Sequence, residues 1–257
     1  MKISVKIILQ YLTLLIGLAG VISLQKLYIY KIKSQETKDY LKEEKALKTI
    51  VEIQKKMPTF GFDNLIANWN FLQFIQYFGD AEARQKTGHS LISDYFEVVV
   101  KRDPRFVQAL MILSPANSIY GGNPKKTIAL MEEALNYITP KTHPYASLIW
   151  SYKGVDELLF LGDAKAAQSS YEKAAEWALQ REDEIGKEMA VRNLETANFL
   201  ADNPDSKKAQ VGAWALILSN APDEQTRQRA IQEIRALGGD IIVSPSGGLQ
   251  IKMPEED

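Results

Sequence analysis

The stretch from Leu159 to Leu179 reads LFLGDAKAAQSSYEKAAEWAL and combines a turn with a helical pattern of small and aromatic residues. Ala167, Tyr171 and Ala174 follow one another at spacings of four and three residues, so a helix places them on one face. Two alanines on that face let a neighbouring helix approach closely, and the tyrosine ring fills the space between them. Such a helix cannot bury this face alone, so the sequence predicts further helices stacked against it.

This spacing resembles the second half of a tetratricopeptide repeat. In that family a turn glycine is followed at set offsets by alanine, an aromatic residue and alanine. Four residues of this chain fall on those offsets: Gly162, Ala167, Tyr171 and Ala174. The resemblance implies an all-α fold, a solenoid of stacked helix pairs.

Two earlier turn glycines extend the resemblance towards the amino terminus. Gly79, Gly122 and Gly162 are 43 and 40 residues apart, which is longer than the family's usual period of about 34 residues. The helix after Gly122 carries Thr127 and Met131 where the family has alanine and an aromatic residue. We therefore expect about three degenerate repeats with extended loops.

The solenoid is expected over residues 59–239. Its last part has three helical segments separated by clear turns, and we expect them to close the solenoid as an atypical cap. These segments are Glu184–Ala201, Ser206–Ser219 and Pro222–Leu237. The tail, residues 240–257, is expected to form either a short hairpin or a flexible extension.

The amino-terminal residues 1–30 predict a membrane anchor. The run Ile7–Leu24 carries no charge and is just long enough for a transmembrane helix. A cleaved signal peptide is the alternative, with Val21 and Ser23 as the small residues before the cut. Lysines on both sides of the run leave the orientation undecided, and a short amino-terminal anchor by default places the soluble part in the periplasm or a lumen.

Residues 31–58 predict a charged helical stalk that continues out of the membrane. Lysine and glutamate alternate along it, and Met57-Pro58 ends it because the residue before proline disfavours helical backbone. Since acidic residues interrupt the lysines, a solvated helix is favoured over a lipid-binding patch.

The stretch Phe60–Asp80 reads FGFDNLIANWNFLQFIQYFGD and predicts an aromatic-rich first helix of a repeat. It resembles the opening of a group of bacterial membrane-anchored tetratricopeptide proteins, including cyanobacterial ones. For Trp69 we favour packing in the core over a role in a binding surface.

Composition excludes several classes of function. A net charge of −1 argues against a nucleic-acid-binding protein, since these carry strongly basic surfaces. The chain has no cysteine and only His89 and His143, so the sequence predicts no metal site and no cofactor. The acidic pair Asp156-Glu157 is expected to be solvated on a charged helix. Without a convergent set of titratable groups, we expect that the protein is not an enzyme.

The sequence therefore predicts a membrane-anchored scaffold that presents a helical groove to a protein partner. In the family that the chain resembles, the first helix of each repeat lines the concave side. Carried over residue by residue, this implies the groove residues Gln73, Gln76, Ile112, Ala116, Tyr152, Asp156 and Leu159. They differ from the asparagine- and lysine-rich clamps of some members, so binding of a carboxyl-terminal peptide is not implied.

Two other functions fit the same architecture. One is an assembly or maintenance factor for a membrane protein complex, a photosynthetic complex if the cyanobacterial resemblance holds. The other is a structural subunit of such a complex. A factor has varied, substoichiometric clients, whereas a subunit has one constant neighbour.

Overall fold

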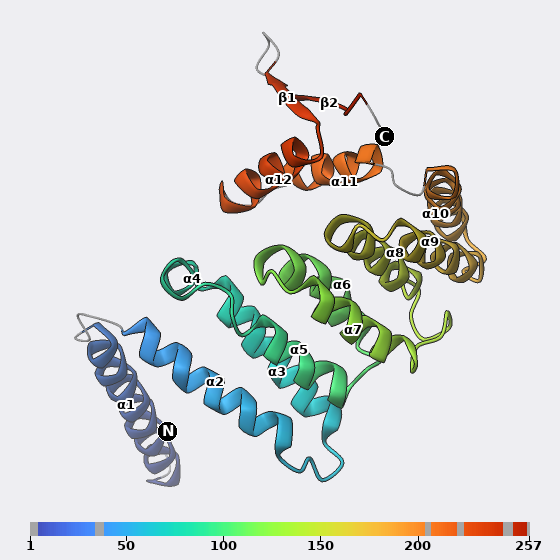
Figure 1. Ribbon diagram of the computed structural model, residues 1–257. Coiled ribbons are helices and arrows are strands. Elements are labelled where there is room, and N and C mark those ends of the chain that lie inside the picture. The colour runs from blue at the N-terminus through green and yellow to red at the C-terminus, as the bar shows by residue number, and fades with distance from the viewer. Residues whose placement is uncertain (1–4, 34–38, 204–206, 220–223, 244–248, 256–257) are drawn as a thin grey trace. The chain divides into compact units, whose positions relative to one another are not determined.

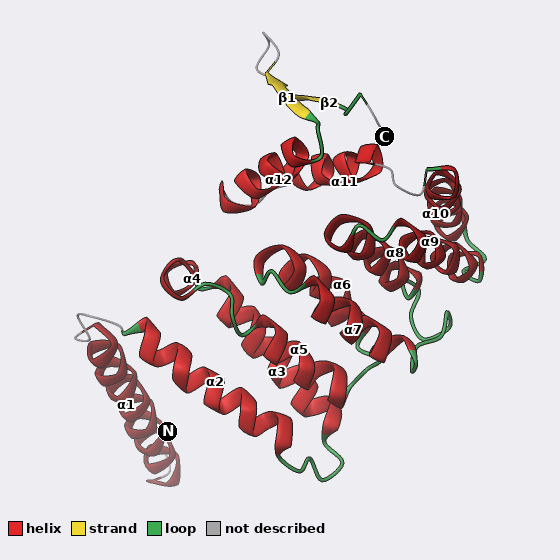
Figure 2. Ribbon diagram, viewed as in Figure 1, coloured by secondary structure: helices red, strands yellow, loops and turns green. Residues whose placement is uncertain are grey.

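The computed structural model describes residues 5–33, 39–203, 207–219, 224–243 and 249–255 (Figure 1). Over these ranges the chain is helical apart from one two-stranded hairpin, which confirms the all-α prediction (Figure 2). It divides into two compact units, Met1–Glu43 and Glu44–Asp257.

The described helices follow this order along the chain. The first are α1 (Val5–Lys33), α2 (Tyr40–Lys56), α3 (Asp63–Gly79), α4 (Ala81–Thr87) and α5 (Ile92–Arg102). They are followed by α6 (Val107–Leu113), α7 (Pro124–Leu135), α8 (Ser147–Asp156), α9 (Ala164–Leu179) and α10 (Glu184–Asp202). The last are α11 (Lys207–Ser219) and α12 (Glu224–Ala236). Two π-helical segments, η1 (Ser114–Tyr120) and η2 (Glu157–Leu161), continue α6 and α8.

In the first unit, α1 exposes large apolar side chains around its circumference. Those that are described and exposed include Leu12, Leu14, Leu15, Ile16, Leu18, Val21, Leu24 and Leu27. The predicted span Ile7–Leu24 begins at residues whose side chains lie outside the described part of the chain. Within the residues that are described, no helix has the length and apolar character needed to cross a membrane.

The predicted stalk, residues 31–58, differs from the structure. Residues 34–38 lie outside the described residues, and from Glu44 onward α2 belongs to the second unit. Val51 of α2 is 1% exposed in the main hydrophobic core, and Leu47 packs against that core. The predicted helix is present, but from Glu44 onward one side of it packs against the core, while Lys45, Lys48 and Lys56 are exposed.

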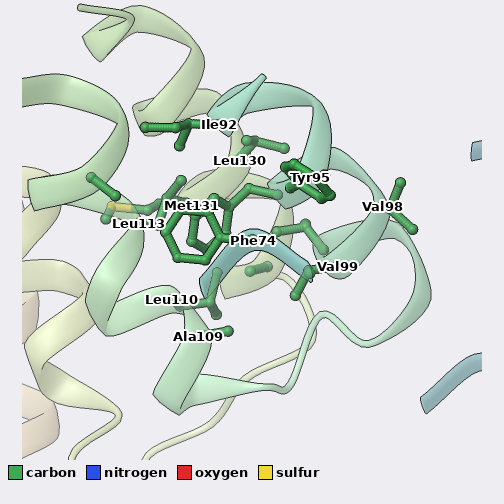
Figure 3. Close-up of a cluster of buried hydrophobic side chains, with 14 of the residues drawn as sticks. Phe74, Ile92, Tyr95, Val98, Val99, Ala109, Leu110, Leu113, Leu130 and Met131 are labelled. Carbon is green, nitrogen blue, oxygen red and sulfur yellow. The ribbon is translucent and has the colours of Figure 1, made fainter. Parts of the chain in front are cut away.

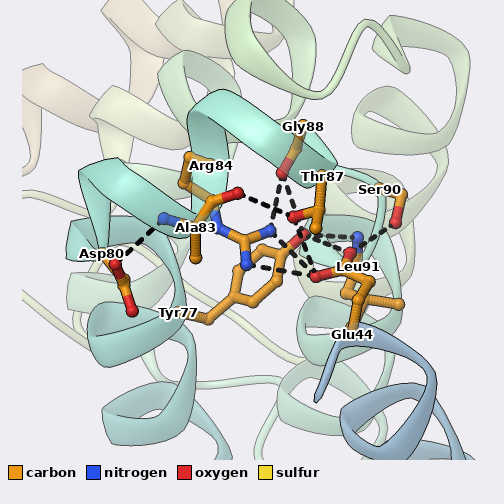
Figure 4. Close-up of polar contacts among 9 residues, drawn as sticks. All are labelled: Glu44, Tyr77, Asp80, Ala83, Arg84, Thr87, Gly88, Ser90 and Leu91. Carbon is orange, nitrogen blue, oxygen red and sulfur yellow. Dashed lines mark hydrogen bonds and ion pairs between the residues drawn. The ribbon is translucent and has the colours of Figure 1, made fainter. Parts of the chain in front are cut away.

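A buried ion pair holds the amino-terminal half of this packed segment (Figure 4). Glu44 Oε2 accepts hydrogen bonds from Arg84 Nη1 at 3.0 Å and Nη2 at 3.1 Å. Its Oε1 accepts from the Tyr77 hydroxyl at 2.9 Å and from Ser90 Oγ at 2.8 Å. The Arg84 guanidinium also lies 3.5 Å from the centre of the Tyr77 ring, a cation–π contact. Arg84 comes from the short helix α4, which thus supplies the cation that pairs with α2.

The carboxyl end of α2 is held by α5. The Lys55 ammonium contacts the carboxylates of Asp94 and Glu97. Although burial opposes the shift, these carboxylates raise the pKa of Lys55 above its ordinary value. Arg102 Nη2 donates to the carbonyl of Met57 at 2.7 Å and so satisfies a backbone acceptor just beyond the helix end.

Apolar side chains from α2, α3, α5, α6, η1, α7 and α8 contribute to the main core of the second unit. Figure 3 shows Phe74 of α3 among residues from α5, α6 and α7, including Tyr95 and Leu110. Phe74 packs on Phe96 with ring centres 4.7 Å apart. Aromatic side chains bury a large apolar area each, so this cluster contributes much of the hydrophobic stabilisation of the amino-terminal half.

The chain widens into a π-helix at the end of both α6 and α8. Pro115 has no N–H and cannot close the α-helical hydrogen bond to the residue four positions earlier, which accounts for the π-helix at η1. The two segments end with the same kind of hydrogen bond. The backbone N–H of Asn123 donates to the backbone carbonyl of Asn117 at 2.9 Å, and the backbone N–H of Asp163 donates to the backbone carbonyl of Glu157 at 3.0 Å. At Pro115 the helix therefore continues with a change of helix type.

The face that decides the fold is buried as predicted. Ala167 and Ala174 of α9 are fully buried, and α9 packs against α8 and α10. A Cβ atom at Gly154 of α8 would lie 3.1 Å from the Tyr171 ring, so the glycine makes room for this ring. Burial raises the pKa of Tyr171 to about 12.

The carboxyl-terminal part forms a second apolar cluster. Trp214 of α11 packs edge-on against Phe160 of η2, and Ile234 of α12 is buried in the same cluster. β1 (Asp240–Val243) and β2 (Leu249–Lys252) pair antiparallel, which selects the hairpin among the two alternatives for the tail. Residues 244–248 between the strands lie outside the described residues.

Ala174→Leu should lower the free energy of unfolding by about 1–3 kcal/mol, because the extra methylenes must enter a packed helix seam. Urea unfolding followed by circular dichroism measures the change. Ser169→Leu, an exposed position on the same helix, is the matched control and should stay close to wild type. Equal stability of the Ala174→Leu and wild-type proteins would contradict the packing of α9.

Candidate interaction surface

Helix α3 buries one side and leaves an apolar side exposed. Its buried side carries Ala67, Phe74 and Tyr77, which recur at helical spacing and face the core. On the opposite side, Trp69 is 51% exposed. The α3 surface, as we call this exposed side, consists of Phe62, Leu65, Trp69, Leu72 and Ile75. The prediction that Trp69 packs in the core is wrong: its helix has more apolar residues than one buried face can take.

The α3 surface is also free of charge along its length. Between Asp63 and Asp80 the sequence contains no charged residue, and the exposed polar positions are amides such as Asn68 and Gln76. Apolar and amide groups together suit contact with another protein, since neither demands a charged partner on desolvation.

Four of the predicted groove residues are at least partly exposed. Gln76 is exposed on α3 beside the α3 surface, and Gln73 on the same helix is half-buried. Ile112 of α6 is 37% exposed, and Tyr152 of α8 is half-buried. These residues remain candidates for contact with a partner.

The other three predicted groove residues are buried. Ala116, Asp156 and Leu159 are 2%, 0% and 7% exposed. Leu159 lies in the cluster of α11 and α12, so the carboxyl-terminal cap covers this part of the expected groove. Ala116 and Leu159 lie in η1 and η2, where the π-helix shifts the register assumed from the family pattern. Exposure of these three residues was wrongly predicted.

Asp156 is a buried acid held by two hydroxyl groups. Its Oδ1 accepts from Ser114 Oγ at 2.9 Å and its Oδ2 from Ser118 Oγ at 2.8 Å. Burial raises the pKa of Asp156 to about 7, although both hydrogen bonds oppose the rise. The expectation of a solvated acidic pair is wrong here, and Asp156→Ala would remove two buried hydrogen bonds.

Its neighbour Glu157 is buried as well but is paired with a cation. The Lys153 ammonium contacts Glu157 Oε1, and Ser170 Oγ donates to Glu157 Oε2 at 2.6 Å. Lys153 Nζ also lies 3.3 Å from Ser170 Oγ. Each polar group in this cluster has a partner, which is typical of a buried network that fixes the packing of α8 on α9.

A polar cleft of about 460 Å³ lies where η1 meets α12. Arg229 at its wall donates to the carbonyl of Ile119 at 2.8 Å. The cleft is lined by Ile119, Tyr120, Thr226, Gln228, Arg229, Gln232 and Glu233. Arg229 donates to backbone carbonyls at the end of η1, so we assign it a structural role in the contact between η1 and α12.

No family model matches this chain, and a search of curated proteins finds no match.

The pH dependence of stability should report the buried Asp156. Folding raises its pKa from 3.8 to about 7, so between these pH values the folded protein keeps a proton that the unfolded chain releases. The stabilisation from the neutral form is complete below about pH 4 and is lost as the pH rises to about 7, with a slope of at most about 1.4 kcal/mol per pH unit.

Asp156→Asn removes this titration while keeping the shape of the side chain. Relative to wild type, the unfolding free energy of the variant should therefore rise steadily between about pH 4 and pH 7. Urea unfolding across this range measures the difference, with Asp202→Asn at an exposed position as the control. A constant difference across the range would show that Asp156 does not titrate as its burial requires.

Proposed function

We propose that the protein is a membrane-anchored scaffold of tetratricopeptide-like helical repeats that binds a protein partner through the α3 surface. The observation that carries this proposal is the row of exposed apolar side chains on α3, with Trp69 at its centre. Contiguous exposed apolar surface marks interaction sites, and tryptophan is enriched among residues that dominate binding energy.

The repeat assignment rests on two kinds of likeness between α6–α7 and α8–α9. The π-helical segments end on the same backbone hydrogen bond, from the residue before the next helix to a carbonyl six residues earlier. The following helices bury corresponding residues, Thr127 and Met131 in α7 and Ala167 and Tyr171 in α9. This likeness supports a repeated helix pair.

The partner is expected to be a protein segment with an apolar, weakly charged face. The α3 surface offers no charge to pair with a phosphate backbone, and the net charge of the chain is −1. An amphipathic helix laid along α3 would bury Leu65, Trp69 and Leu72 together, since they lie on one side of the helix.

Affinity capture from detergent extracts tests the α3 surface. The triple variant Leu65→Asn, Trp69→Ala, Leu72→Asn should recover at least about tenfold less partner, because the central tryptophan alone is worth about 2 kcal/mol or more in such interfaces. The matched control replaces three exposed apolar residues of α9 and α10: Leu179→Asn, Ile185→Asn and Val191→Ala. Undiminished recovery with the α3 variant would rule out this surface.

The same capture separates the scaffold from the two related functions. One constant neighbour in equimolar amount favours a structural subunit of a membrane complex, and varied substoichiometric clients favour an assembly or maintenance factor.

Anchoring rests on the uncharged run Ile7–Leu24 and on the exposed apolar side chains of α1. A helix with exposed apolar side chains on all sides suits a lipid environment. The full-length chain should therefore stay with membranes after an alkaline carbonate wash, while a chain lacking residues 1–30 should be released. Release of the full-length chain would favour cleavage or peripheral attachment.

A further inference from the structure

From Glu44 onward, the charged side chains of α2 differ in exposure in a way that the sequence alone does not show. The segment Glu44–Lys56 contains two acidic residues, Glu44 and Glu52, among four lysines. Glu44 points into the protein, where Arg84 and three hydroxyl groups occupy its carboxylate. Glu52 is paired with Lys55 at 2.7 Å. Glu44 is therefore neutralised inside the protein, whereas the Glu52 side chain is 41% exposed and shares Lys55 with Asp94 and Glu97.

Most of the exposed charges on this segment are positive. Lys45, Lys48 and Lys56 are exposed, and among the described contacts none pairs them with a carboxylate. At the amino end of α2, Lys42 and Glu43 are both exposed and offset each other.

An apolar row runs beside these lysines. Ile50 is 50% and Ile53 59% exposed; Ile53 lies on the side of α2 opposite the buried Val51, and Ile50 lies between that side and the core. Ala46 is exposed on the same side, four residues before Ile50. We call Lys45, Lys48, Ile50, Ile53 and Lys56 the α2 face. The lysines border the apolar row on one side, and a helix that combines exposed apolar side chains with lysines suits binding to a membrane surface.

We propose that the α2 face rests on an anionic lipid surface. The isoleucines would enter the boundary between headgroups and acyl chains, and the lysines would remain at the level of the lipid phosphates. Charge complementarity selects this occupant: each lysine near such a surface favours binding roughly fivefold, so three act on the order of a hundredfold together. The α2 face is distinct from the α3 surface and does not depend on the protein partner.

A fluorescent probe on α2 tests the contact. The chain has no cysteine, so Ile53→Cys gives a single site for an environment-sensitive dye on the full-length protein. In vesicles of phosphatidylcholine with about 30% phosphatidylglycerol the dye emission should shift to the blue, and in phosphatidylcholine alone it should not. Ser169→Cys on α9 carries the same dye as control and should respond to neither. Equal emission at position 53 in both lipids would overturn the proposal.

Charge variants give the second arm. Lys45→Gln, Lys48→Gln, Lys56→Gln together should abolish the blue shift, as should about 0.5 M KCl, which screens surface charge. The control Lys165→Gln, Lys173→Gln, Lys187→Gln removes as many exposed lysines from α9 and α10 and should keep the shift. A shift that survives loss of the α2 lysines would overturn recognition of anionic lipid. Because the readout is local to α2, neither result depends on carbonate extraction or on partner capture.

Discussion

A carboxylate that is buried on folding needs charged and hydrogen-bonding partners inside the protein. Glu44 has such partners, and they could not be predicted from the sequence. Arg84, Tyr77, Thr87 and Ser90 surround its two oxygen atoms. The short helix α4 supplies the arginine. The ion pair also fixes the rotation of α2 about its axis, so the exposed lysines and isoleucines face away from the core.

Periodicity and turn residues were enough to predict the helices. The small residues Ala167 and Ala174 are buried at a helix seam, and the carboxyl-terminal helices follow the predicted segments closely. Such patterns are local, and local spacing decides which residues share a helix face. The direction of a charged side chain is not local: Glu44 and Arg84 are 40 residues apart, and nothing in the alternation of lysine and glutamate shows which members turn inward.

In the candidate surface, too, local spacing could be predicted from the sequence but the burial of individual side chains could not. Gln76 could be placed at an exposed position from the spacing of α3, but Trp69 was assigned to the core because large aromatic residues are usually buried. Asp156 was assigned to the surface because acidic residues are usually exposed, and only the hydroxyls of Ser114 and Ser118, from another helix, make its burial tolerable. Residue type gives the average behaviour, whereas the partners that decide each case are brought together by the fold.

The contact between Arg229 and the carbonyl of Ile119 joins residues 110 positions apart. The ribosome makes Ile119 long before it makes Arg229. The carbonyl of Ile119, at the end of η1, therefore receives the hydrogen bond from Arg229 only after α12 has been translated. Helix pairs near the amino terminus can form as they emerge, since their contacts are close in sequence. The contacts of η1 are thus complete only when the carboxyl-terminal helix α12 has folded. A truncated translation product lacking α12 leaves the carbonyl of Ile119 open to water.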